Sequence, residues 1–332
     1  MVICELMASE GEGGLENHFY DVVNGLSSHN EVHVIANSSF ENGFSESVTF
    51  HAVNLNRSRS NIFLLLEVLR LIRKIAPDVV HVHASKGSSI VSKIKRFLPC
   101  PVVATVHSLK RNVSMFTNMD ALIGVSRDVL TPINHGKKYV VYNGRLIEKL
   151  PPLPDREKKV IDTAVIVGRL VDVKRVDVAI DAIAKVPNLR LLVVGDGSNR
   201  AQLAAQVDQL GIADRVEFLG YRTDAQNIMQ SADVVIISSD REGFPLVMVE
   251  ALLLGKYLVS TKVPGVVEFI PPNYLSETGD SDMLAKSIQS LMHDPERSYK
   301  DFLPVWEKAR YELTLDSQLQ RTQDILQSIA RG

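Results

Sequence analysis

The sequence has few cysteines, little net charge and no long apolar run. Its 332 residues contain only Cys4 and Cys100, which excludes a disulfide framework or a cysteine metal site and favours a reducing, cytoplasmic compartment. A net charge of −2 excludes polyelectrolyte character, so nucleic acid is not an expected partner. The N-terminus lacks the basic segment of a secretory signal. The most apolar predicted helix, 62–72, is too short to cross a bilayer.

What is present describes a soluble α/β protein of two domains. An apolar fraction of 45% and a charged fraction of 23% are typical of globular proteins with sizeable cores. Alternating strands and helices run through the chain twice, separated by the proline-rich segment Leu150–Asp155. We therefore expect two Rossmann-like domains of parallel strands, 1–150 and 151–309. We also expect a C-terminal helix at about 310–330 that can pack back onto the first domain.

Positive charge is concentrated in one region of the first half. Between Arg57 and Arg111, eleven Lys and Arg residues face only Glu67 and Asp78, a local charge of +9. Such a region can bind an anionic surface, for example a phospholipid leaflet. A solvated helix face is an equally good interpretation.

The first half contains a glycine-rich loop and several histidines. The apolar strand 2–7, the loop 9–14 and the helix 15–26 form the start of a nucleotide-binding fold, although the loop lacks the Gly-x-Gly-x-x-Gly spacing of dinucleotide sites. His81 and His83 share one face of a strand. No Asp, Glu or Cys at a nearby offset completes a metal site with them, so we expect buried, hydrogen-bonded histidines. His107 directly follows another strand, where open sheets place ligand-binding groups.

The most informative stretch is Ser238–Gly255, in which an apolar strand passes through a turn into a helix. The first backbone amides of that helix, near Leu246 and Val247, form an anion site. Glu242 lies in the turn. Glu250, on a mostly apolar helix face, needs a partner, which is either a ligand hydroxyl or a structural salt bridge. Arg169 and Lys174 follow another strand of the same half. They are interpreted either as cations that bind a diphosphate or as ordinary surface cations.

Motifs in both halves occur in a specific order. In the second half they are Gly168-Arg-Leu with Lys174, Gly195-Asp-Gly197, Phe218-Leu-Gly220 and Glu242-Gly-Phe-Pro-Leu-Val-Met-Val-Glu250. In the first half they are Gly13-Gly14, His81-Val-His83, Thr105-Val-His107, Gly124-Val-Ser126 and Asn143-Gly144. Together they resemble the retaining glycosyltransferases of family 4. The resemblance implies the GT-B fold, in which two Rossmann-like domains face a deep cleft.

The resemblance also implies roles for individual residues. Glu250 would bind the ribose of the nucleotide, and Glu242 would contact the donor sugar and distal phosphate. Arg169 and Lys174 would neutralise the diphosphate in place of a divalent metal, so neither a metal nor a cofactor is expected. His107 would lie beside the donor sugar. The other expected donor contacts are Gly14, Gly168, Tyr221, Arg222, Gly243, Phe244, Leu246 and Val247.

The implied activity is metal-independent, retaining transfer of a hexosyl or N-acetylhexosaminyl group from a UDP or GDP sugar. The acceptor would be a hydroxyl of a glycan or lipid-linked glycan, in cell-surface polysaccharide or lipopolysaccharide synthesis. This places the enzyme in the cytoplasm or against the inner face of the plasma membrane. Alternatives are a sugar-nucleotide epimerase, a phosphorylase and a non-catalytic nucleotide-sugar binding protein, with a nicotinamide dehydrogenase more distant. The two glutamates are not interpreted as a glycosidase acid/base pair, because a retaining transferase of this kind needs no protein nucleophile.

Overall fold

The computed structural model describes residues 1–9, 13–154 and 160–331. Residues 10–12 of the glycine-rich loop and Asp155 of the proline-rich segment therefore lie outside the described residues. The chain forms two compact units. Unit 1 consists of residues 1–143 together with the C-terminal residues from Leu315, and unit 2 consists of residues 144–314.

Unit 1 is built on a parallel sheet, which has seven strands among the described residues, in the order β3-β2-β1-β4-β5-β6-β7. The strands are β1 Val2–Met7, β2 Glu31–Ala36, β3 Val48–Ala52, β4 Val79–His83, β5 Val102–Val106, β6 Ala121–Gly124 and β7 Lys138–Val140. The central strands consist mainly of buried Val, Ile, Leu and Ala, the pattern of a sheet covered on both faces. The strand order reverses between β1 and β4, and such switch points bind ligands in open α/β sheets.

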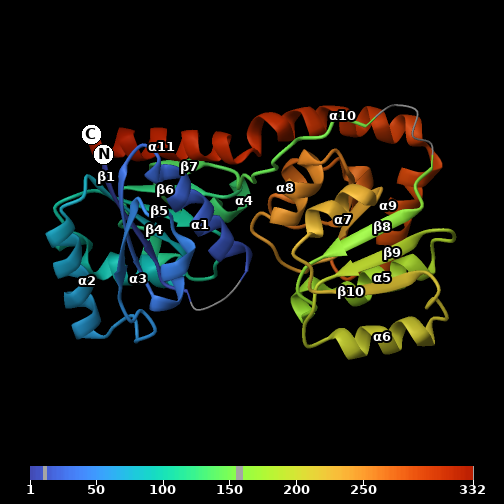
Figure 1. Cartoon of the computed structure of the whole chain (residues 1–332), viewed down its shortest axis with the longest axis horizontal. Helices are drawn as coiled ribbons and strands as arrows, with labels where there is room; N and C mark the ends of the chain where they lie inside the picture. Colours follow the sequence, from blue (N-terminus) through green and yellow to red (C-terminus); the bar gives the residue numbers. More distant parts are fainter. Residues whose placement is uncertain (10–12, 155–159, 332) are drawn as a thin grey trace. The chain divides into compact units, whose positions relative to one another are not determined.

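Helices cover both faces of this sheet. The longer helices are α1 Gly14–Ser27, α2 Ile62–Ile75, α3 Ala84–Ile94 and the C-terminal α11 Leu315–Arg331. Helices α1 and α11 pack together on one face, where Phe19 and Leu326 join the main hydrophobic core of the unit (Figure 1). Helix α3 packs on the other face, against Leu6 and Val82. Residues at odd positions of β1 and β4 thus point toward α1 and α11.

Unit 2 repeats the design. Its sheet, also parallel, has six strands in the described part of the chain, in the order β10-β9-β8-β11-β12-β13. The strands are β8 Thr163–Val167, β9 Arg190–Val194, β10 Val216–Gly220, β11 Val234–Ile237, β12 Tyr257–Thr261 and β13 Leu275–Ser276. The helices are α5 Val176–Ala184, α6 Arg200–Gln209, α7 Ala225–Ser231, α8 Leu246–Leu253, α9 Ser281–His293 and α10 Pro295–Glu312. Helices α5 and α6 cover one face, and α7 and α8 cover the other (Figure 1).

The division between the units differs from the boundary expected at residue 150. It falls between Asn143 and Gly144, and the segment up to Pro154 packs on unit 2. Arg310 of α10 donates a hydrogen bond to the carbonyl of Pro151, and Pro154 lies against Gly255. Packing contacts therefore place the described part of the proline-rich segment in unit 2.

The apolar segment predicted to be helical at 62–72 forms α2, which continues to Ile75. Helix α3 begins at Ala84, directly after β4. Ala84 adopts a left-handed conformation with φ of 61°, which turns the chain from strand to helix without an intervening loop. Among the described residues, no helix is both long and apolar enough to cross a membrane.

Candidate functional site

Two loops of unit 2 lie at the switch point of its sheet. Strand β8 ends at Val167 and continues into Gly168 and Arg169, while the neighbouring β11 continues into the turn that carries Glu242. The ammonium nitrogen of Lys174 lies 2.6 Å from Oε1 of Glu242. Both side chains are partly buried, whereas Arg169 is exposed. The structure therefore joins two of the predicted site residues and leaves the Arg169 guanidinium in solvent.

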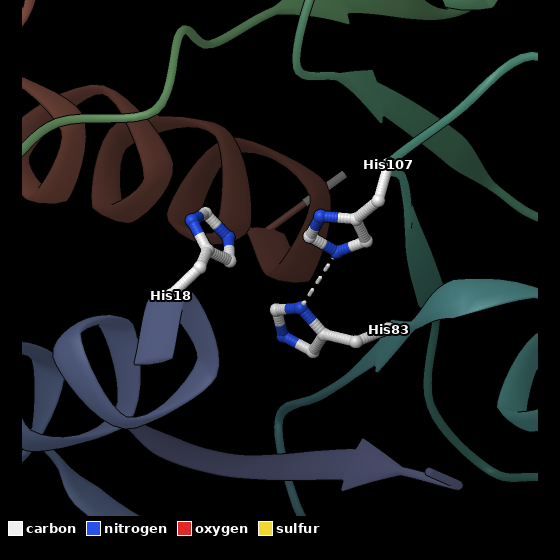
Figure 2. Close-up of side chains that lie close together, drawn as sticks. All are labelled: His18, His83 and His107. Atoms are coloured by element: carbon white, nitrogen blue, oxygen red, sulfur yellow. Dashed lines mark hydrogen bonds between the residues drawn. The ribbon is translucent and has the colours of Figure 1, made fainter. Parts of the chain in front are cut away.

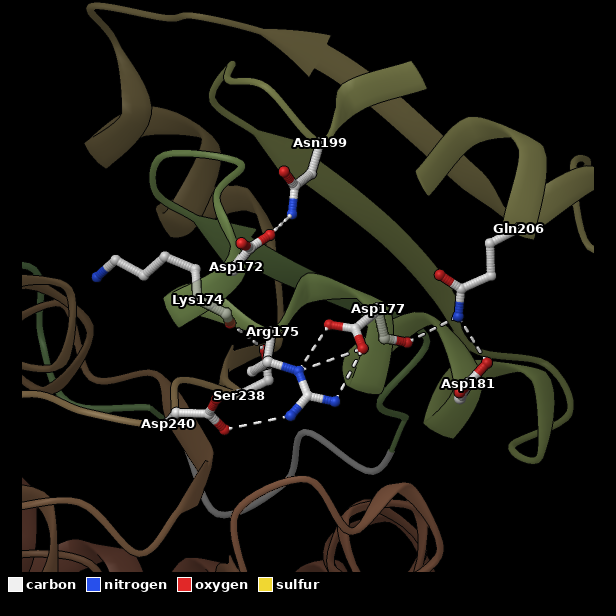
Figure 3. Close-up of polar contacts among 9 residues, drawn as sticks. All are labelled: Asp172, Lys174, Arg175, Asp177, Asp181, Asn199, Gln206, Ser238 and Asp240. Carbon is white, nitrogen blue, oxygen red and sulfur yellow. Dashed lines mark hydrogen bonds and ion pairs between the residues drawn. The ribbon is translucent and has the colours of Figure 1, made fainter. Parts of the chain in front are cut away.

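Hydrogen bonds and ion pairs made by side chains hold these loops in place (Figure 3). The hydroxyl of Ser238 donates to the carbonyl oxygen of Lys174 over 2.9 Å. The next residue, Arg175, has a left-handed φ of 48°, which is unfavourable for a residue other than glycine. Its guanidinium pairs with Asp177 at 3.0 Å and Asp240 at 3.3 Å. These contacts offset the cost of the left-handed backbone and fix the position of the neighbouring residue, Lys174.

Two glycines permit close packing around the same loops. A Cβ on Gly195 would lie 1.9 Å from the carbonyl oxygen of Gly168, so only glycine lets the loops after β8 and β9 approach this closely. Gly265 has a φ of 80°, and a Cβ there would lie 2.5 Å from the ring of Phe244. The turn Glu242–Pro245 is thus packed against the segment that contains Gly265.

Helix α8 positions Glu250 and begins where the anion site was predicted. Its first helical hydrogen bonds run from Met248 and Val249 to Pro245, so the N–H groups of Leu246 and Val247 belong to the first turn. Glu250 is buried, and its Oε1 accepts a hydrogen bond from Nε of Arg145 over 2.9 Å. One oxygen of this carboxylate therefore has a partner within the protein. The sequence alone did not identify Arg145 as this partner, because 105 residues separate the two in the chain.

Tyr221 and Arg222 lie after the edge strand β10, which β9 separates from β8. Tyr221 is 79% exposed. Arg222 pairs with Asp224 at 2.7 Å. An exposed aromatic ring beside a cation is suited to stacking on a planar group.

Unit 1 contains a second cluster, at the switch point between β1 and β4. Oε1 of Glu5 lies 3.0 Å from Nδ1 of His81, and Oε2 lies 2.8 Å from Nε2 of His83. Both histidines are buried and hydrogen-bonded, as expected. The expectation that no carboxylate supports them was wrong. Glu5 is directly opposite His81 in the parallel register of β1 and β4, although 76 residues separate them.

The cluster extends to His107 at the end of β5. Nε2 of His107 lies 3.3 Å from Nδ1 of His83, and the ring of His18 on α1 is 4.9 Å from the His107 ring between centroids. Figure 2 shows the three imidazoles converging from three elements. Gln318 of α11 contacts Nδ1 of His18 at 3.2 Å. One sequence feature could have predicted the role of Glu5: it is a charged residue inside an apolar strand, where it requires a buried partner.

Burial sets the charge of this cluster. Burial alone would raise the pKa of the Glu5 carboxyl, but the charge and hydrogen bonds of His81 and His83 outweigh it and lower the pKa to about 2. Burial, together with the charge of His81, lowers the pKa of His83 to about 4. Burial and the neighbouring His18 and His83 lower the pKa of His107 well below its usual value. His83 and His107 are therefore neutral at pH 7, beside an ionised carboxylate.

Gly14 begins α1, and its neighbour Gly13 precedes the helix. Two residues after Gly14, the carboxylate of Glu16 in the first turn accepts a hydrogen bond from the hydroxyl of Ser9. The preceding three residues of the loop lie outside the described part of the chain. The N-terminus of α1 therefore carries an acid of its own beside the glycines predicted to approach phosphate.

Two doubly wound parallel domains in one chain form the GT-B architecture. A solved structure from Anabaena, HepE in complex with UDP, has this fold with a TM-score of 0.82 at 22% identity, covering 99% of this chain and 100% of that one. A glycosyltransferase structure from Rickettsia africae has a TM-score of 0.85 at 17% identity, covering 100% and 99%.

The sequence comparisons agree with the fold. The family model described as Glycosyltransferase Family 4 matches residues 12–148, and the one described as Glycosyl transferases group 1 matches residues 154–302. The lipopolysaccharide core biosynthesis glycosyltransferase LpsD of Rhizobium meliloti is 27% identical over 302 residues, 86% of each chain. LpsE of the same organism is 26% identical over 72% of each chain. The chain belongs to the family 4 type of GT-B glycosyltransferases, and its activity is the transfer of a sugar.

Proposed function

We propose that this glycosyltransferase uses a nucleotide-diphosphate sugar, of UDP or GDP type, to glycosylate a hydroxyl of a glycan or lipid-linked glycan. The pathway would be the synthesis of lipopolysaccharide or a related cell-surface polysaccharide. The observation that carries the proposal is the ion pair between Lys174 and Glu242 at the switch point of unit 2, with Glu242 in the turn that leads into α8. Relatives that make the lipopolysaccharide core, and the UDP complex of HepE, support the choice of donor and acceptor.

The donor would bind to unit 2 through charge complementarity. Arg169 and Lys174 would neutralise the diphosphate, and the amides of Leu246 and Val247 would bind further phosphate oxygens. Because Lys174 is already paired with Glu242, a diphosphate has to share or displace that contact. Glu250 would accept hydrogen bonds from the ribose hydroxyls, Tyr221 would stack on the base, and Arg222 would lie beside it. Gly168, Gly243 and Phe244 would shape the loops around the donor.

The cations Arg169 and Lys174 would take the place of a divalent metal on the leaving diphosphate. We therefore propose a metal-independent reaction that needs no cofactor, transfers a hexosyl or N-acetylhexosaminyl group and retains the anomeric configuration. His107 would contact the transferred sugar, and Gly14 would allow close approach to phosphate. Metal independence is tested by turnover in EDTA. Retention is tested by the anomeric coupling in the NMR spectrum of the product.

Calorimetric titration with UDP, GDP and ADP tests the donor assignment. A nucleotide at a hundredfold excess over its dissociation constant stabilises the fold by about 2.7 kcal/mol, which also makes thermal shift a usable screen. Glu250→Ala should abolish nucleotide binding while the circular dichroism spectrum stays unchanged. Glu217→Ala, an exposed acid on β10, is the matched control and should bind as the wild type does. Unchanged affinity in Glu250→Ala would exclude the ribose role.

The acceptor side would involve the basic region Arg57–Arg111. On α2, the apolar side chains of Ile62 and Phe63 are 59% and 73% exposed, and Arg70 and Lys74 on the same helix are exposed too. Other cations of the region are engaged within the protein, for example Lys95 with Asp120 at 2.8 Å. We propose that the outer face of α2 contacts an anionic membrane surface that presents the acceptor.

Vesicle flotation tests this contact. Vesicles containing phosphatidylglycerol should bind the protein, while vesicles of phosphatidylcholine alone should not. The double variant Arg70→Glu with Lys74→Glu should lose binding, because it reverses the charge of the exposed face. Lys300→Glu, an exposed lysine of α10, is the control. Equal flotation of the double variant and the wild type would reject the contact.

A further inference from the structure

The histidine cluster of unit 1 has the composition of a metal site. His18 comes from α1, His83 from the end of β4, and His107 from the residue after β5 (Figure 2). One ring nitrogen from each residue can be chosen so that all three lie within 4.8 Å of one another. His18 and His83 are buried, and His107 is partly exposed, so the cluster is reachable from solvent at one side.

The spacing of two of these nitrogens already suits a metal ion. Bonds of about 2.0–2.1 Å from Zn²⁺ to imidazole nitrogens in a tetrahedral site place two ligand nitrogens about 3.3–3.4 Å apart. Nδ1 of His83 lies 3.3 Å from Nε2 of His107. In the metal-free protein these two nitrogens share a hydrogen-bonding proton, which a metal ion would replace. The His18 ring would need to approach by about 1.5 Å at most to complete the third ligand position.

Residues behind the cluster orient the imidazoles. Oε2 of Glu5, which is fully buried, lies 2.8 Å from Nε2 of His83 and thereby directs Nδ1 of that ring toward His107. A carboxylate bonded to the far nitrogen of a histidine is the usual outer shell of a histidine metal ligand. Gln318 contacts Nδ1 of His18 at 3.2 Å and holds that ring from the α11 side. The buried negative charge of Glu5 also stabilises a cation placed among otherwise neutral rings.

A second group of possible ligands, Glu5 with His81 and His83, also has its ligand atoms within 4.8 Å of one another, but these atoms already make hydrogen bonds. Nδ1 of His81 lies 3.0 Å from Glu5, and Nε2 lies 2.7 Å from the hydroxyl of Thr105. A metal ion there would have to displace a buried hydrogen bond at one of these nitrogens. The three-histidine arrangement requires no such loss at His107 beyond its shared proton with His83.

We propose that His18, His83 and His107 form a binding site for a divalent transition-metal ion, with Glu5 and Gln318 as outer partners. Three imidazoles suit Zn²⁺, Co²⁺, Ni²⁺ or Cu²⁺ and disfavour Mg²⁺, which prefers oxygen ligands. Three protein ligands leave a fourth tetrahedral position for water or another ligand. All five residues belong to unit 1, whereas the cations of the proposed diphosphate clamp belong to unit 2.

The consequence for catalysis rests on the proposed function. If His107 contacts the transferred sugar, a bound metal ion takes that histidine away from the substrate. Micromolar Zn²⁺ should then inhibit sugar transfer, and EDTA should restore it. Metal binding is measured without donor or acceptor, so it does not depend on the catalytic role of His107. Zn²⁺ binding without inhibition would reject that role, whereas absence of Zn²⁺ binding would reject the metal site.

The direct test is calorimetric titration of the full-length, chelator-treated protein with ZnCl₂, with MgCl₂ as the negative probe. We expect one tight Zn²⁺ per chain, no Mg²⁺ binding, and a visible d–d absorption band when CoCl₂ is used. His107→Gln should abolish both the tight Zn²⁺ binding and the Co²⁺ band. Glu5→Gln should weaken Zn²⁺ binding by about 10–100-fold, since it removes only the outer partner.

The control is a second histidine pair on the same unit. Nδ1 of His33 lies 3.0 Å from Nε2 of His51, so this pair could bind Zn²⁺ without any prepared site. His51→Ala should leave the tight site unchanged. Because His107 is partly exposed, His107→Gln should fold, and an equal melting temperature in EDTA checks this. Absence of tight Zn²⁺ binding in the wild type would overturn the proposal, as would binding that survives His107→Gln or is lost in His51→Ala.

Discussion

The ammonium group of Lys174 lies 2.6 Å from Oε1 of Glu242 and links the loops that follow β8 and β11. The cation expected to bind a diphosphate is therefore already paired with the acid expected to contact the donor sugar. Donor binding must redistribute this charge, because one ammonium group then serves both the carboxylate and the phosphates. The pair holds the two loops together before the donor arrives.

Removal of either partner should have opposite effects on nucleotide affinity. Lys174→Met should lower UDP affinity by about 10–100-fold, the usual cost of losing a charge-assisted hydrogen bond. Glu242→Gln should raise UDP affinity a few-fold, because Lys174 becomes available to phosphate, while the rate of sugar transfer falls. Calorimetry and a transfer assay measure the two quantities. The control is Lys185→Met, which breaks a similar pair with Asp282 at 2.7 Å on the helical surface. Wild-type affinity in Lys174→Met would contradict the clamp.

The pair between Arg145 and Glu250 should contribute to the stability of unit 2. Their side chains are only 20% and 11% exposed, so Arg145→Met leaves a largely buried carboxylate without its cation. We expect a loss of about 1–3 kcal/mol in the free energy of unfolding, measured by urea denaturation. The double variant with Glu250→Gln should lose less than the sum of the single variants, because the unpaired charge is gone. Lys300→Met, which removes an exposed pair with Glu296, should cost less than about 1 kcal/mol. A similarly small loss in Arg145→Met would show that the pair is solvated.

Gly265 should be intolerant of any side chain, because it supports the turn that carries Glu242. Its φ of 80° disfavours other residues, and a Cβ would meet the ring of Phe244 at 2.5 Å and the Cα of Phe244 at 3.1 Å. Gly265→Ala should destabilise the protein by roughly 1–3 kcal/mol and also weaken UDP binding.

Gly211→Ala is the matched control for this substitution. Gly211 also has a positive φ, 65°, but a Cβ there would meet nothing within 4 Å. It should therefore show only the backbone cost of about 1 kcal/mol and normal UDP affinity. Equal effects of the two substitutions on UDP binding would show that contact with Phe244 is unimportant.

His83 should make the protein sensitive to mild acid. Burial and the charge of His81 lower the pKa of its imidazole from 6.5 to about 4. As the pH falls below about 6.5, the unfolded chain binds a proton that the native protein does not yet bind. The stability contributed by neutral His83 is thus complete above pH 6.5 and is lost as the pH approaches 4, by about 3 kcal/mol in total. Glu5, also part of the cluster, keeps its charge across this range because its pKa is lowered to about 2.

Urea denaturation between about pH 7.5 and about pH 4.5 measures this loss. His83→Gln should reduce the slope of unfolding free energy against pH by up to about 1.4 kcal/mol per pH unit. His107 belongs to the same cluster and its pKa is also lowered by burial, so part of the wild-type slope should remain in the variant. An unchanged slope in His83→Gln would mean that His83 titrates normally.

Much of the fold follows from local patterns in the chain. Apolar runs in β4 and β11 predict buried strands, and periodic apolar residues with a capping Asn61 or Asp280 predict α2 and α9. The turn and helix from Glu242 to Glu250 likewise follow from a strand, a glycine and an amphipathic helix. These features depend on residues close in sequence, so the sequence alone specifies them.

The identity of the partners depended on tertiary structure. Alternation along the strands places His81, His83 and His107 on the same face of their sheet, but it does not say that β1 lies beside β4 or that Glu5 is opposite His81. Glu250 was expected to need a partner, and only the folded chain brings Arg145 to it. A charged or hydrogen-bonding group in an apolar element predicts that a bonding partner is present, because burial without a partner is costly. Strand order and register decide which distant residue is that partner.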